Sequence, residues 1–397
     1  MSVDWLPRRA LVVGLARSGR AAVAALERRG VDVVAVDREL GNDDPAVAAD
    51  VDLVVKSPGV PGEAPVVAAA RKRGVPVWSE VELGYRLLDG APFYGVTGTN
   101  GKTTTTELLG SILRAAGRPV EVAGNVGTAL TEVAERIEPG AAVVCELSSF
   151  QLEDVHTLAC DVAVLLNLEP DHLDRHGSFE AYRDAKLRIF ERARVKVAPR
   201  GYGIADAIEF AGDDPLPAEP RLPGEHNREN AAAATAAARA AGVGDDAIAE
   251  ALRTFAGVPH RLELVRELRG VRYVNDSKAT NTAAARRGIA AYAAPLHVIL
   301  GGSSKGEDFG PFARDLPATV RTIHLIGEAS GELGAALDVA GRAYDGDGDL
   351  EHAIAHAASV AEDGDVVLLS PACASYDQFE NFEQRGDVFR ALVERLT

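Results

Sequence analysis

Short apolar runs alternate with helical patterns along almost the whole 397-residue chain, and this alternation restricts the fold more than any other feature. An apolar run at 10–14 is followed by a helical pattern at 19–29 and a second run at 31–36. Two strands joined by a helix have this order, so the segment predicts a β-α-β unit. The alternation continues to the end of the chain, which predicts an α/β fold.

The runs fall into three series, which predict three domains at 1–91, 92–257 and 258–397. A hinge is expected at 89–92, and the Gly-, Pro- and acid-rich stretch 199–223 predicts loops. The remaining strands are expected at 51–55, 75–78, 93–96, 141–147, 161–166, 271–274, 296–300, 322–326 and 365–369, and further helices at 103–116, 227–241 and 351–361.

Composition and charge exclude several classes of protein. The net charge of −17 argues against a protein that coats nucleic acid or an anionic membrane. The chain has no run of 18 apolar residues, so no membrane span is expected. Its three cysteines are scattered without CxxC spacing, which indicates neither a disulfide framework nor a zinc site. We therefore expect a cytoplasmic protein.

The loop from Gly95 to Thr104 carries the strongest chemical signal. It joins an apolar run to a helical pattern and places Gly101, Lys102 and Thr103 at the turn. Glycines let backbone N–H groups approach phosphate oxygens, a lysine neutralises phosphate charge, and a threonine hydroxyl reaches a magnesium ion. The match is imperfect, because Val96 stands where the pattern has its first glycine. A flexible loop without a ligand is the alternative.

Two acid-bearing segments follow the next apolar runs. Glu146 ends the run at 141–146, and Asp171 and His172 follow the run at 161–166. The carboxyl ends of parallel strands meet at one edge of a sheet, so these side chains are candidates for a cation bound to phosphates. A surface or capping role is the alternative for His172.

Three further segments hold an unusual density of polar groups. Gly14 to Gly19, with Asp37 after the next run, imitates a dinucleotide fingerprint, although Ala16 replaces its middle glycine. This is weak support for a nucleotide, and a turn without a ligand remains possible. In the third series, 275–281 and 370–382 each follow an apolar run, and Lys305 follows another. Each could bind an anion, cap a helix or lie in solvent.

Together these motifs resemble the Mur ligases of peptidoglycan synthesis, and more narrowly the glutamate-adding members of that family. The resemblance extends from Gly14 to Phe389. The segments that carry it are 97–103, 146–151, 167–174, 226–230, 276–281 and 370–375.

The resemblance implies a Rossmann-like N-terminal domain that binds UDP, a central P-loop ATPase-like domain and a Rossmann-like C-terminal domain. It also implies ATP-dependent ligation of D-glutamate to UDP-N-acetylmuramoyl-L-alanine. ATP would phosphorylate the terminal carboxylate, and the amine of glutamate would displace phosphate from the acyl phosphate. ATP and two Mg²⁺ ions are the implied cofactors.

Site residues are implied in the same way. Lys102, Glu146, His172 and Lys186 are implied in catalysis. Thr103, Glu146 and His172 are the implied metal ligands, joined by Lys186 if it is carbamylated; a salt bridge on a helix surface is the plain alternative for that lysine. ATP contacts fall on Gly98, Thr99, Asn100, Gly101, Lys102, Thr103, Thr104, Asn230, Arg261, Asp276 and Lys278. UDP-substrate contacts fall on Arg17, Ser18, Asp37, Ser57, Pro58, Gly59, Asn125, Ser148 and Gln151. Glutamate contacts fall on Thr280, Lys305, Ser375 and Phe382.

The sequence departs from the family pattern at two places, where residue roles are not carried over from the family. Ser303 stands where an acid is common, and the stretch between Lys186 and His226 looks short. The other activities considered are an L-glutamate-adding variant, an NAD-dependent dehydrogenase and an NTP-dependent switch. The dehydrogenase leaves Lys102 unexplained. The sequence does not fix the enantiomer of glutamate, and a monomer is expected.

Overall fold

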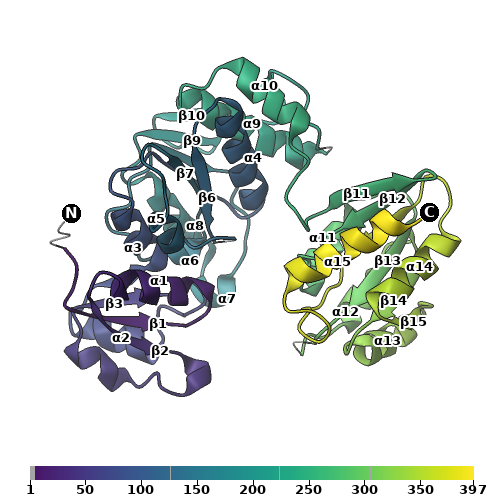
Figure 1. The fold of residues 1–397 in the computed structure, drawn as a ribbon, viewed down its shortest axis with the longest axis horizontal. Coiled ribbons are helices and arrows are strands. Elements are labelled where there is room, and N and C mark those ends of the chain that lie inside the picture. Colours follow the sequence, from purple (N-terminus) through teal and green to yellow (C-terminus); the bar gives the residue numbers. More distant parts are fainter. Residues whose placement is uncertain (1–4, 126, 223, 305) are drawn as a thin grey trace. The chain divides into compact units, whose positions relative to one another are not determined.

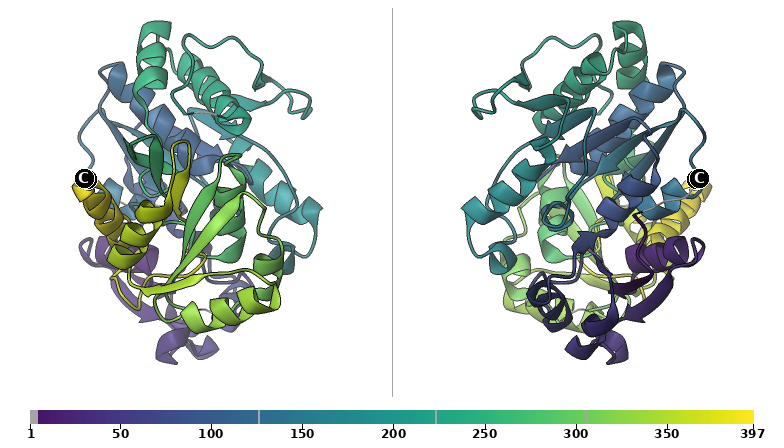
Figure 2. Two further views of the ribbon diagram at one scale, coloured as in Figure 1. Left: turned by 90° about the vertical axis from the view of Figure 1, so that its right-hand side faces the viewer. Right: turned by 90° about the vertical axis from the view of Figure 1, so that its left-hand side faces the viewer.

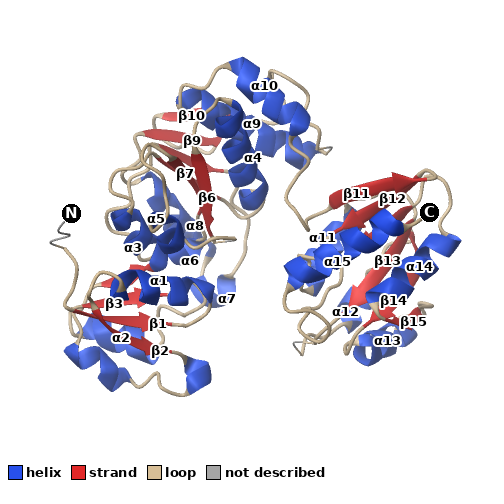
Figure 3. Cartoon of the chain, viewed as in Figure 1, coloured by secondary structure: helices blue, strands red, loops and turns tan. Residues whose placement is uncertain are grey.

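The computed structural model describes residues 5–125, 127–222, 224–304 and 306–397. These residues form two compact units, Met1–Phe255 and Ala256–Thr397. The first unit contains a four-stranded sheet and a six-stranded sheet, and the second contains another six-stranded sheet. Helices cover the sheets within each unit (Figures 1 and 3), so the expected α/β fold is confirmed.

The first sheet is parallel and has the strand order β2-β1-β3-β4. Its apolar strands are buried between two clusters of side chains, as expected for a sheet with helices on both faces. The elements are β1 (Arg9–Val13), α1 (Arg17–Glu27), β2 (Asp32–Val36), η1 (Arg38–Leu40), η2 (Pro45–Asp50), β3 (Leu53–Lys56), α2 (Pro65–Lys72), β4 (Val77–Ser79) and α3 (Glu80–Leu87).

The second sheet is parallel throughout, in the order β10-β9-β8-β5-β7-β6. The alanine-rich helix α9 packs against α4, β8 and β9 on one face, where its small side chains allow a close approach. The elements are β5 (Phe93–Thr97), α4 (Lys102–Ala115), β6 (Val120–Gly124), α5 (Leu130–Ala134), β7 (Ala142–Glu146), α6 (Ser149–Leu152), β8 (Val162–Leu165), α7 (Leu173–His176), α8 (Phe179–Leu187), η3 (Arg188–Phe190), β9 (Val195–Pro199), β10 (Ala207–Phe210), α9 (Glu225–Ala240) and α10 (Asp245–Thr254).

One expectation for this sheet was wrong. The stretch 199–223 was expected to form loops, but it contains the strand β10. This strand lies at the edge of the sheet and has two exposed residues, so it lacks the apolar run of a central strand. The partly exposed edge strand β6 escaped prediction for the same reason.

Buried polar contacts connect the first sheet to the second within unit Met1–Phe255. The carboxylate of Glu82 accepts hydrogen bonds from the backbone N–H groups of His156, Thr157 and Leu158 at 2.9–3.2 Å. The buried ammonium of Lys56 lies 3.1 Å from Asp154 Oδ2. These contacts position the first sheet against the second. The two boundaries between the three domains inferred above stay predictions.

The third sheet has the order β11-β12-β16-β13-β14-β15, with β11 antiparallel to β12 and the rest parallel. Helix α15 packs along β11 and β12 (yellow in Figures 1 and 2). The elements are β11 (Glu263–Leu268), β12 (Val271–Asn275), α11 (Thr282–Ala290), β13 (Leu296–Gly301), α12 (Gly310–Arg314), β14 (Val320–Ile326), α13 (Ser330–Val339), β15 (Asp345–Gly348), α14 (Leu350–Val360), β16 (Val366–Leu369) and α15 (Phe382–Arg395).

Two further global expectations concern membranes and cysteines. Among the described residues, the structure contains no helix long and apolar enough to cross a membrane. Cys145, Cys160 and Cys373 are free and buried, which agrees with the absence of a disulfide framework expected from their spacing.

Candidate active site

The candidate site lies at the carboxyl edge of the second sheet. Strand β5 is hydrogen-bonded to β7 on one side and to β8 on the other, with Val96 opposite Glu146 and Thr97 opposite Leu165. The segments that follow these three neighbouring strands therefore meet at one edge, as expected for a ligand site in a parallel sheet. They contain the loop 98–101, Glu146 and the segment 167–172.

The loop 98–101 leads directly into α4, which begins at Lys102. Gly101 has φ +80°, and a Cβ at this position would lie 2.2 Å from Oδ1 of Asn230. A side chain is therefore excluded both by the backbone conformation and by the buried Asn230, which reaches the loop from α9. This arrangement brings together the predicted phosphate loop and one of the predicted ATP contacts.

Two lysines point into the same loop. Lys102 Nζ donates to the carbonyl oxygens of Gly98 and Thr99, both at 2.9 Å. Lys186 Nζ, from α8, donates to the Gly98 oxygen at 2.8 Å and lies 4.8 Å from the centre of the Tyr182 ring. Burial, and then the charge of Lys102, lower the pKa of Lys186 to about 7. A large share of this amine is therefore uncharged near neutral pH.

Residues that sequence reasoning did not assign to the site hold the loop in place. Asn167 accepts from the backbone N–H of Asn100 through Oδ1 at 2.7 Å, and Glu169 accepts from the Asn100 side chain at 2.9 Å. The Tyr182 and Thr99 hydroxyls lie 2.9 Å apart. Tyr182 and Lys186 are four residues apart on one helix, so their shared face could have been inferred from that spacing.

Glu146 is arranged as a ligand for a cation. It is 3 % exposed, and Asn125 donates to its Oε1 at 3.1 Å. Its Oε2 is buried and has no hydrogen-bond partner among the described residues. An unpaired buried carboxylate oxygen is costly, so a cation at this oxygen would remove a penalty. Thr103 is also buried, in the first turn of α4, and its hydroxyl is the second predicted ligand.

His172 lies after β8 in a left-handed backbone conformation, with φ +51°, and caps the short helix α7. Its side chain is 50 % exposed and its Nε2 lies 3.5 Å from the Asp171 carboxylate. The ring centre is 4.9 Å from that of Phe150. An imidazole held in this way is accessible to a metal ion, which fits its predicted role.

Ser148 and Gln151 form the capping box of α6. Ser148 donates from both its backbone N–H and its hydroxyl to Gln151 Oε1, each at 2.9 Å. Gln151 is fully buried, and its Nε2 has no hydrogen-bond partner among the described residues. Ser148 lies two residues and Gln151 five residues after Glu146, but their predicted substrate contacts stay predictions.

The predicted UDP-binding residues of the first sheet follow β1, β2 and β3. Asp37 accepts from the backbone N–H of Leu15 at 2.5 Å, and this bond lowers the pKa of the Asp37 carboxyl. The Ser57 hydroxyl donates to the Gly14 oxygen at 2.7 Å. The turn at 14–19 therefore shares hydrogen bonds with both neighbouring loops. Ser18 lies in the first turn of α1, directly after this turn, and Gly59 lies in the same loop as Ser57.

Two arginines connect these loops to the second sheet. Arg17 Nη1 donates to the Gly127 oxygen at 2.8 Å. Arg175 donates to the oxygens of Pro58 and Val60, each at 2.9 Å. Predicted UDP-binding residues in the first sheet are thereby held against the segments that follow β6 and β8.

The second unit holds its own cluster of predicted residues. The Asp276 carboxylate is 5 % exposed and accepts from the Ser370 hydroxyl at 2.8 Å and the backbone N–H of Leu262 at 3.3 Å. Burial raises the pKa of Asp276 to about 7. Lys278 follows at the same end of β12, where its backbone N–H donates to the His260 oxygen at 3.0 Å. Arg261 is partly exposed in the adjoining segment.

Arg385 connects the predicted glutamate loops, although the sequence analysis assigned it no role. This fully buried side chain donates to five uncharged oxygens: Ser277 Oγ and the carbonyls of Ser277, Gly301, Cys373 and Ala374, at 2.8–3.4 Å. Its partners lie in the segments after β12, β13 and β16. Arg385 and Gly386 belong to the segment that resembles the glutamate-adding members, but the sequence of α15 does not show that this arginine is buried.

The predicted glutamate residues surround this cluster. Ser375 is 2 % exposed, and Thr280 and Phe382 are partly exposed. The Phe382 ring centre lies 6.2 Å from that of His260. Lys305 lies outside the described residues.

Comparison with known proteins agrees with the motifs. The Mur ligase middle domain matches residues 96–208, and the Mur ligase, glutamate ligase domain matches residues 260–373. The UDP-N-acetylmuramoylalanine–D-glutamate ligase of Myxococcus xanthus is 40% identical over the whole of both chains. The enzyme of the same description from Anaeromyxobacter dehalogenans is 42% identical over 97% of each chain. The chain belongs to the Mur ligase family.

A solved structure supports the same fold for this Mur ligase. The MurF ligase of Thermotoga maritima in complex with ADP is 18% identical and has a TM-score of 0.60, with all of both chains covered. The multi-domain fold of the Mur ligases therefore applies here.

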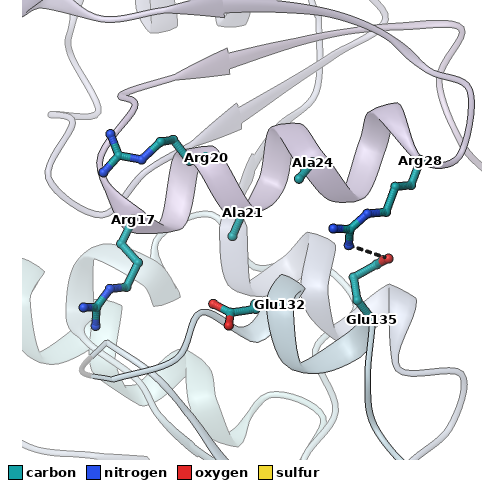
Figure 4. Close-up of a pocket in the computed structure, with 7 residues that line it drawn as sticks. All are labelled: Arg17, Arg20, Ala21, Ala24, Arg28, Glu132 and Glu135. Carbon is teal, nitrogen blue, oxygen red and sulfur yellow. Dashed lines mark hydrogen bonds and ion pairs between the residues drawn. The ribbon is translucent and has the colours of Figure 1, made fainter.

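A pocket elsewhere in this Mur ligase has a different lining from the candidate site. It lies between α1 and α5, and Figure 4 shows Arg28, the residue that caps the C-terminus of α1, paired with Glu135 at the C-terminal end of α5. Of the predicted site residues that the structure describes, Arg17 alone contributes to it. The pocket is lined by Arg17, Arg20, Ala21, Ala24, Arg28, Glu132 and Glu135.

Proposed function

We propose that this Mur ligase joins D-glutamate to UDP-N-acetylmuramoyl-L-alanine with hydrolysis of ATP to ADP and phosphate, as a cytoplasmic monomer. The support is the agreement between curated relatives of that description over the full chain and the buried, unpaired oxygen of Glu146 beside the loop 98–101. We also propose the domain boundaries 1–91, 92–257 and 258–397.

The second sheet would bind ATP. The backbone N–H groups of the loop and the start of α4 offer donors to phosphate oxygens, and the dipole of this 14-residue helix favours negative charge there. Lys102 now donates to loop carbonyls, and a bound phosphate would offer its ammonium a charged acceptor instead. Lys102 would then neutralise charge on the transferred phosphoryl group.

The residues around Glu146 fit the two Mg²⁺ ions that the family implies. Thr103 and Glu146 would hold one ion, and His172 and carbamylated Lys186 the other. Bound Mg²⁺ would shield the substrate carboxylate from the phosphates it attacks. Carbamylation requires an uncharged amine, and the buried Lys186 with its lowered pKa of about 7 meets that condition. The reaction joins Nζ to the carbon of CO₂ and releases one proton.

The other residues would position the remaining reactants. The loops at 14–19, 37 and 57–59 would bind the UDP group, and Asn125, Ser148 and Gln151 the muramoyl-alanine portion. In the second unit, Arg261, Asp276 and Lys278 would contact ATP, and Thr280, Lys305, Ser375 and Phe382 would bind glutamate. Phosphoryl transfer to the alanine carboxylate would give an acyl phosphate; attack by the glutamate amine would form the amide and release phosphate.

Phosphate release tests this proposal. The protein is mixed with ATP, Mg²⁺ and UDP-N-acetylmuramoyl-L-alanine, with D-glutamate, L-glutamate or neither. We expect release that requires the muramoyl substrate and D-glutamate together. Release with L-glutamate instead would establish the L-adding variant, and release that ignores both co-substrates would contradict the ligase. Omitting Mg²⁺ provides the metal control.

A further inference from the structure

A chain of hydrogen-bonded side chains crosses the third sheet, away from the predicted glutamate cluster. Asp365 Oδ2 lies 3.0 Å from His297 Nε2, and His297 Nδ1 lies 2.8 Å from Thr322 Oγ1. The same hydroxyl lies 2.8 Å from His324 Nε2, and His324 Nδ1 lies 2.7 Å from Asp347 Oδ2. The chain therefore connects two carboxylates through two imidazoles and a hydroxyl.

This series of hydrogen-bonded side chains is one hydrogen short of what its contacts require. It contains four contacts, and each needs one hydrogen between its two heavy atoms. Two neutral imidazoles and the Thr322 hydroxyl supply three, while the two carboxylates supply none. With neutral imidazoles, one contact must therefore bring two lone pairs together. His297 and His324 are almost fully buried, so water does not supply the missing hydrogen. A cation at one end of the hydrogen-bonded side chains would remove the contact between two lone pairs.

The two ends differ in what surrounds the carboxylate. Asp365 Oδ2 also accepts from the backbone N–H of Glu362 at 3.0 Å and lies 3.7 Å from the guanidinium of Arg321. These neighbours favour an ionised Asp365 that accepts the His297 hydrogen. The Thr322 hydroxyl then donates to His297 Nδ1, and His324 Nε2 donates to the Thr322 oxygen. The remaining nitrogen, His324 Nδ1, therefore carries a lone pair that faces the carboxylate of Asp347.

Another histidine lies at the Asp347 end of these hydrogen-bonded side chains. His356, on α14, places Nδ1 2.9 Å from the other oxygen of Asp347. One ligand atom from each of His324, Asp347 and His356 lies within 4.8 Å of the other two. The exposure of these side chains increases from 0 % at His324 to 11 % at Asp347 and 40 % at His356. The cluster is therefore anchored inside and open to solvent at His356.

We propose that His324, Asp347 and His356 bind one divalent transition-metal ion of the Zn²⁺ type. Two imidazoles and one carboxylate suit Zn²⁺, whereas Mg²⁺ prefers oxygen ligands and water. Bonds of about 2.0–2.2 Å to Zn²⁺ require small movements of ligand atoms that already lie this close. The chain of Thr322, His297 and Asp365 fixes the orientation of His324, as partners of metal-binding histidines commonly do.

The ion would add a further attachment to the edge strand β15, which pairs with β14. β15 consists of Asp345, Gly346, Asp347 and Gly348, and none of these residues contributes an apolar side chain to the core. Aspartate and glycine are poor strand formers. Asp347 is bonded to β14 through His324 and to α14 through His356, so a metal at this point would join three elements.

Zn²⁺ binding to the full-length protein tests the proposal. The protein is stripped with a chelator and titrated with Zn²⁺ by calorimetry in excess Mg²⁺, without ATP. We expect one Zn²⁺ per chain, and at least tenfold weaker binding by His356→Ala. His352→Ala is the matched control, because this 73 % exposed histidine lies on the same helix and pairs with Asp349 instead. It should keep wild-type affinity.

Co²⁺ gives an independent readout. Its visible absorption should appear in the wild type and His352→Ala, and be lost in His356→Ala. Absence of Zn²⁺ binding would mean that a proton completes the chain and would overturn the proposal. Equal affinity in His356→Ala and the wild type would also overturn it, because the bound ion would then lie elsewhere. Neither result bears on the ligase activity, which is measured by phosphate release.

Discussion

Lys102 and Lys186 donate hydrogen bonds to the same carbonyl oxygen, that of Gly98, at 2.9 and 2.8 Å. The two amines belong to different helices, α4 and α8, and are brought together by the loop after β5. Because two ammonium groups repel each other at such a short range, the buried one releases its proton more easily. Burial and the charge of Lys102 thus lower the pKa of Lys186, the condition that its proposed carbamylation requires.

Carbamylation of Lys186 should rise with pH through about 7, because the pKa of its amine is lowered to that value and only the neutral amine reacts. ¹³C NMR of protein equilibrated with ¹³C-bicarbonate should show one carbamate signal, lost in Lys186→Ala. Lys102→Ala should move the midpoint to higher pH, whereas Lys72→Ala, at an exposed position on α2, should not. A midpoint unmoved by Lys102→Ala would contradict the coupling.

Turnover should fall about 100-fold or more in Lys186→Ala, because the predicted carboxylate ligand is removed. Short carboxylates such as formate or acetate, added at tens of millimolar, should restore part of the phosphate release. They should have no such effect on Lys102→Ala, which lacks an ammonium. Failure of every carboxylate to restore Lys186→Ala would count against the carbamate.

Lys102→Ala should itself reduce phosphate release by about 100-fold or more, since it removes the charge that faces the transferred phosphoryl group. Lys72→Ala serves again as the control. The structural effect should be small, because Lys102 contacts loop carbonyls rather than the core. Substantial activity in Lys102→Ala with ATP would refute the assignment of the loop.

The central strands and the loops after them could be predicted because their sequence is locally distinctive. Gly98 follows the apolar strand β5 and Glu146 ends the apolar strand β7, and parallel topology alone places them at one edge. The edge strands β6, β10, β11 and β15 were missed, because these strands bury less apolar surface and leave a weaker pattern. The inner strand β9 was missed as well, because Lys196 interrupts its short apolar run.

Contacts between distant segments could not be predicted from the sequence, for a different reason. Arg385 binds oxygens of four residues spread from Ser277 to Ala374, and no local pattern records which carbonyls a side chain will meet. The shared acceptor of Lys102 and Lys186 is similar, because 84 residues of sequence separate the two amines. The resemblance named both lysines, but only the structure shows that they meet.

The stability of the C-terminal unit should depend on Asp276. Burial raises the pKa of its carboxyl to about 7, above the value near 4 of an unfolded chain. The folded state therefore binds more protons between these values, and this contribution to stability is lost as pH rises towards and through 7. Asp276→Asn should gain roughly 2–3 kcal/mol relative to the wild type between pH 5 and pH 8.

Hydrogen exchange of the buried amides in β12 and β16 measures this difference in the unit itself. Asp338→Asn, at an exposed position on α13, provides the control and should show no pH-dependent gain. A stability difference between Asp276→Asn and the wild type that is the same at pH 5 and pH 8 would show that the carboxyl ionises normally. Phosphate release should nevertheless fall in Asp276→Asn, because the group is a predicted ATP contact.

Arg385→Met should destabilise the C-terminal unit by roughly 3 kcal/mol or more, because it leaves buried carbonyl oxygens without their donor. Burial lowers the pKa of the Arg385 guanidinium to about 10, so it remains charged at neutral pH. Its charge is balanced by five uncharged oxygens rather than by a carboxylate within ion-pair distance among the described residues. Arg395→Met, on the exposed end of the same helix, should change stability little.

Because Arg385 joins the loops after β12, β13 and β16, the Arg385→Met variant should also raise the KM for glutamate. Unchanged exchange protection together with an unchanged KM would show that the loops hold their positions without it.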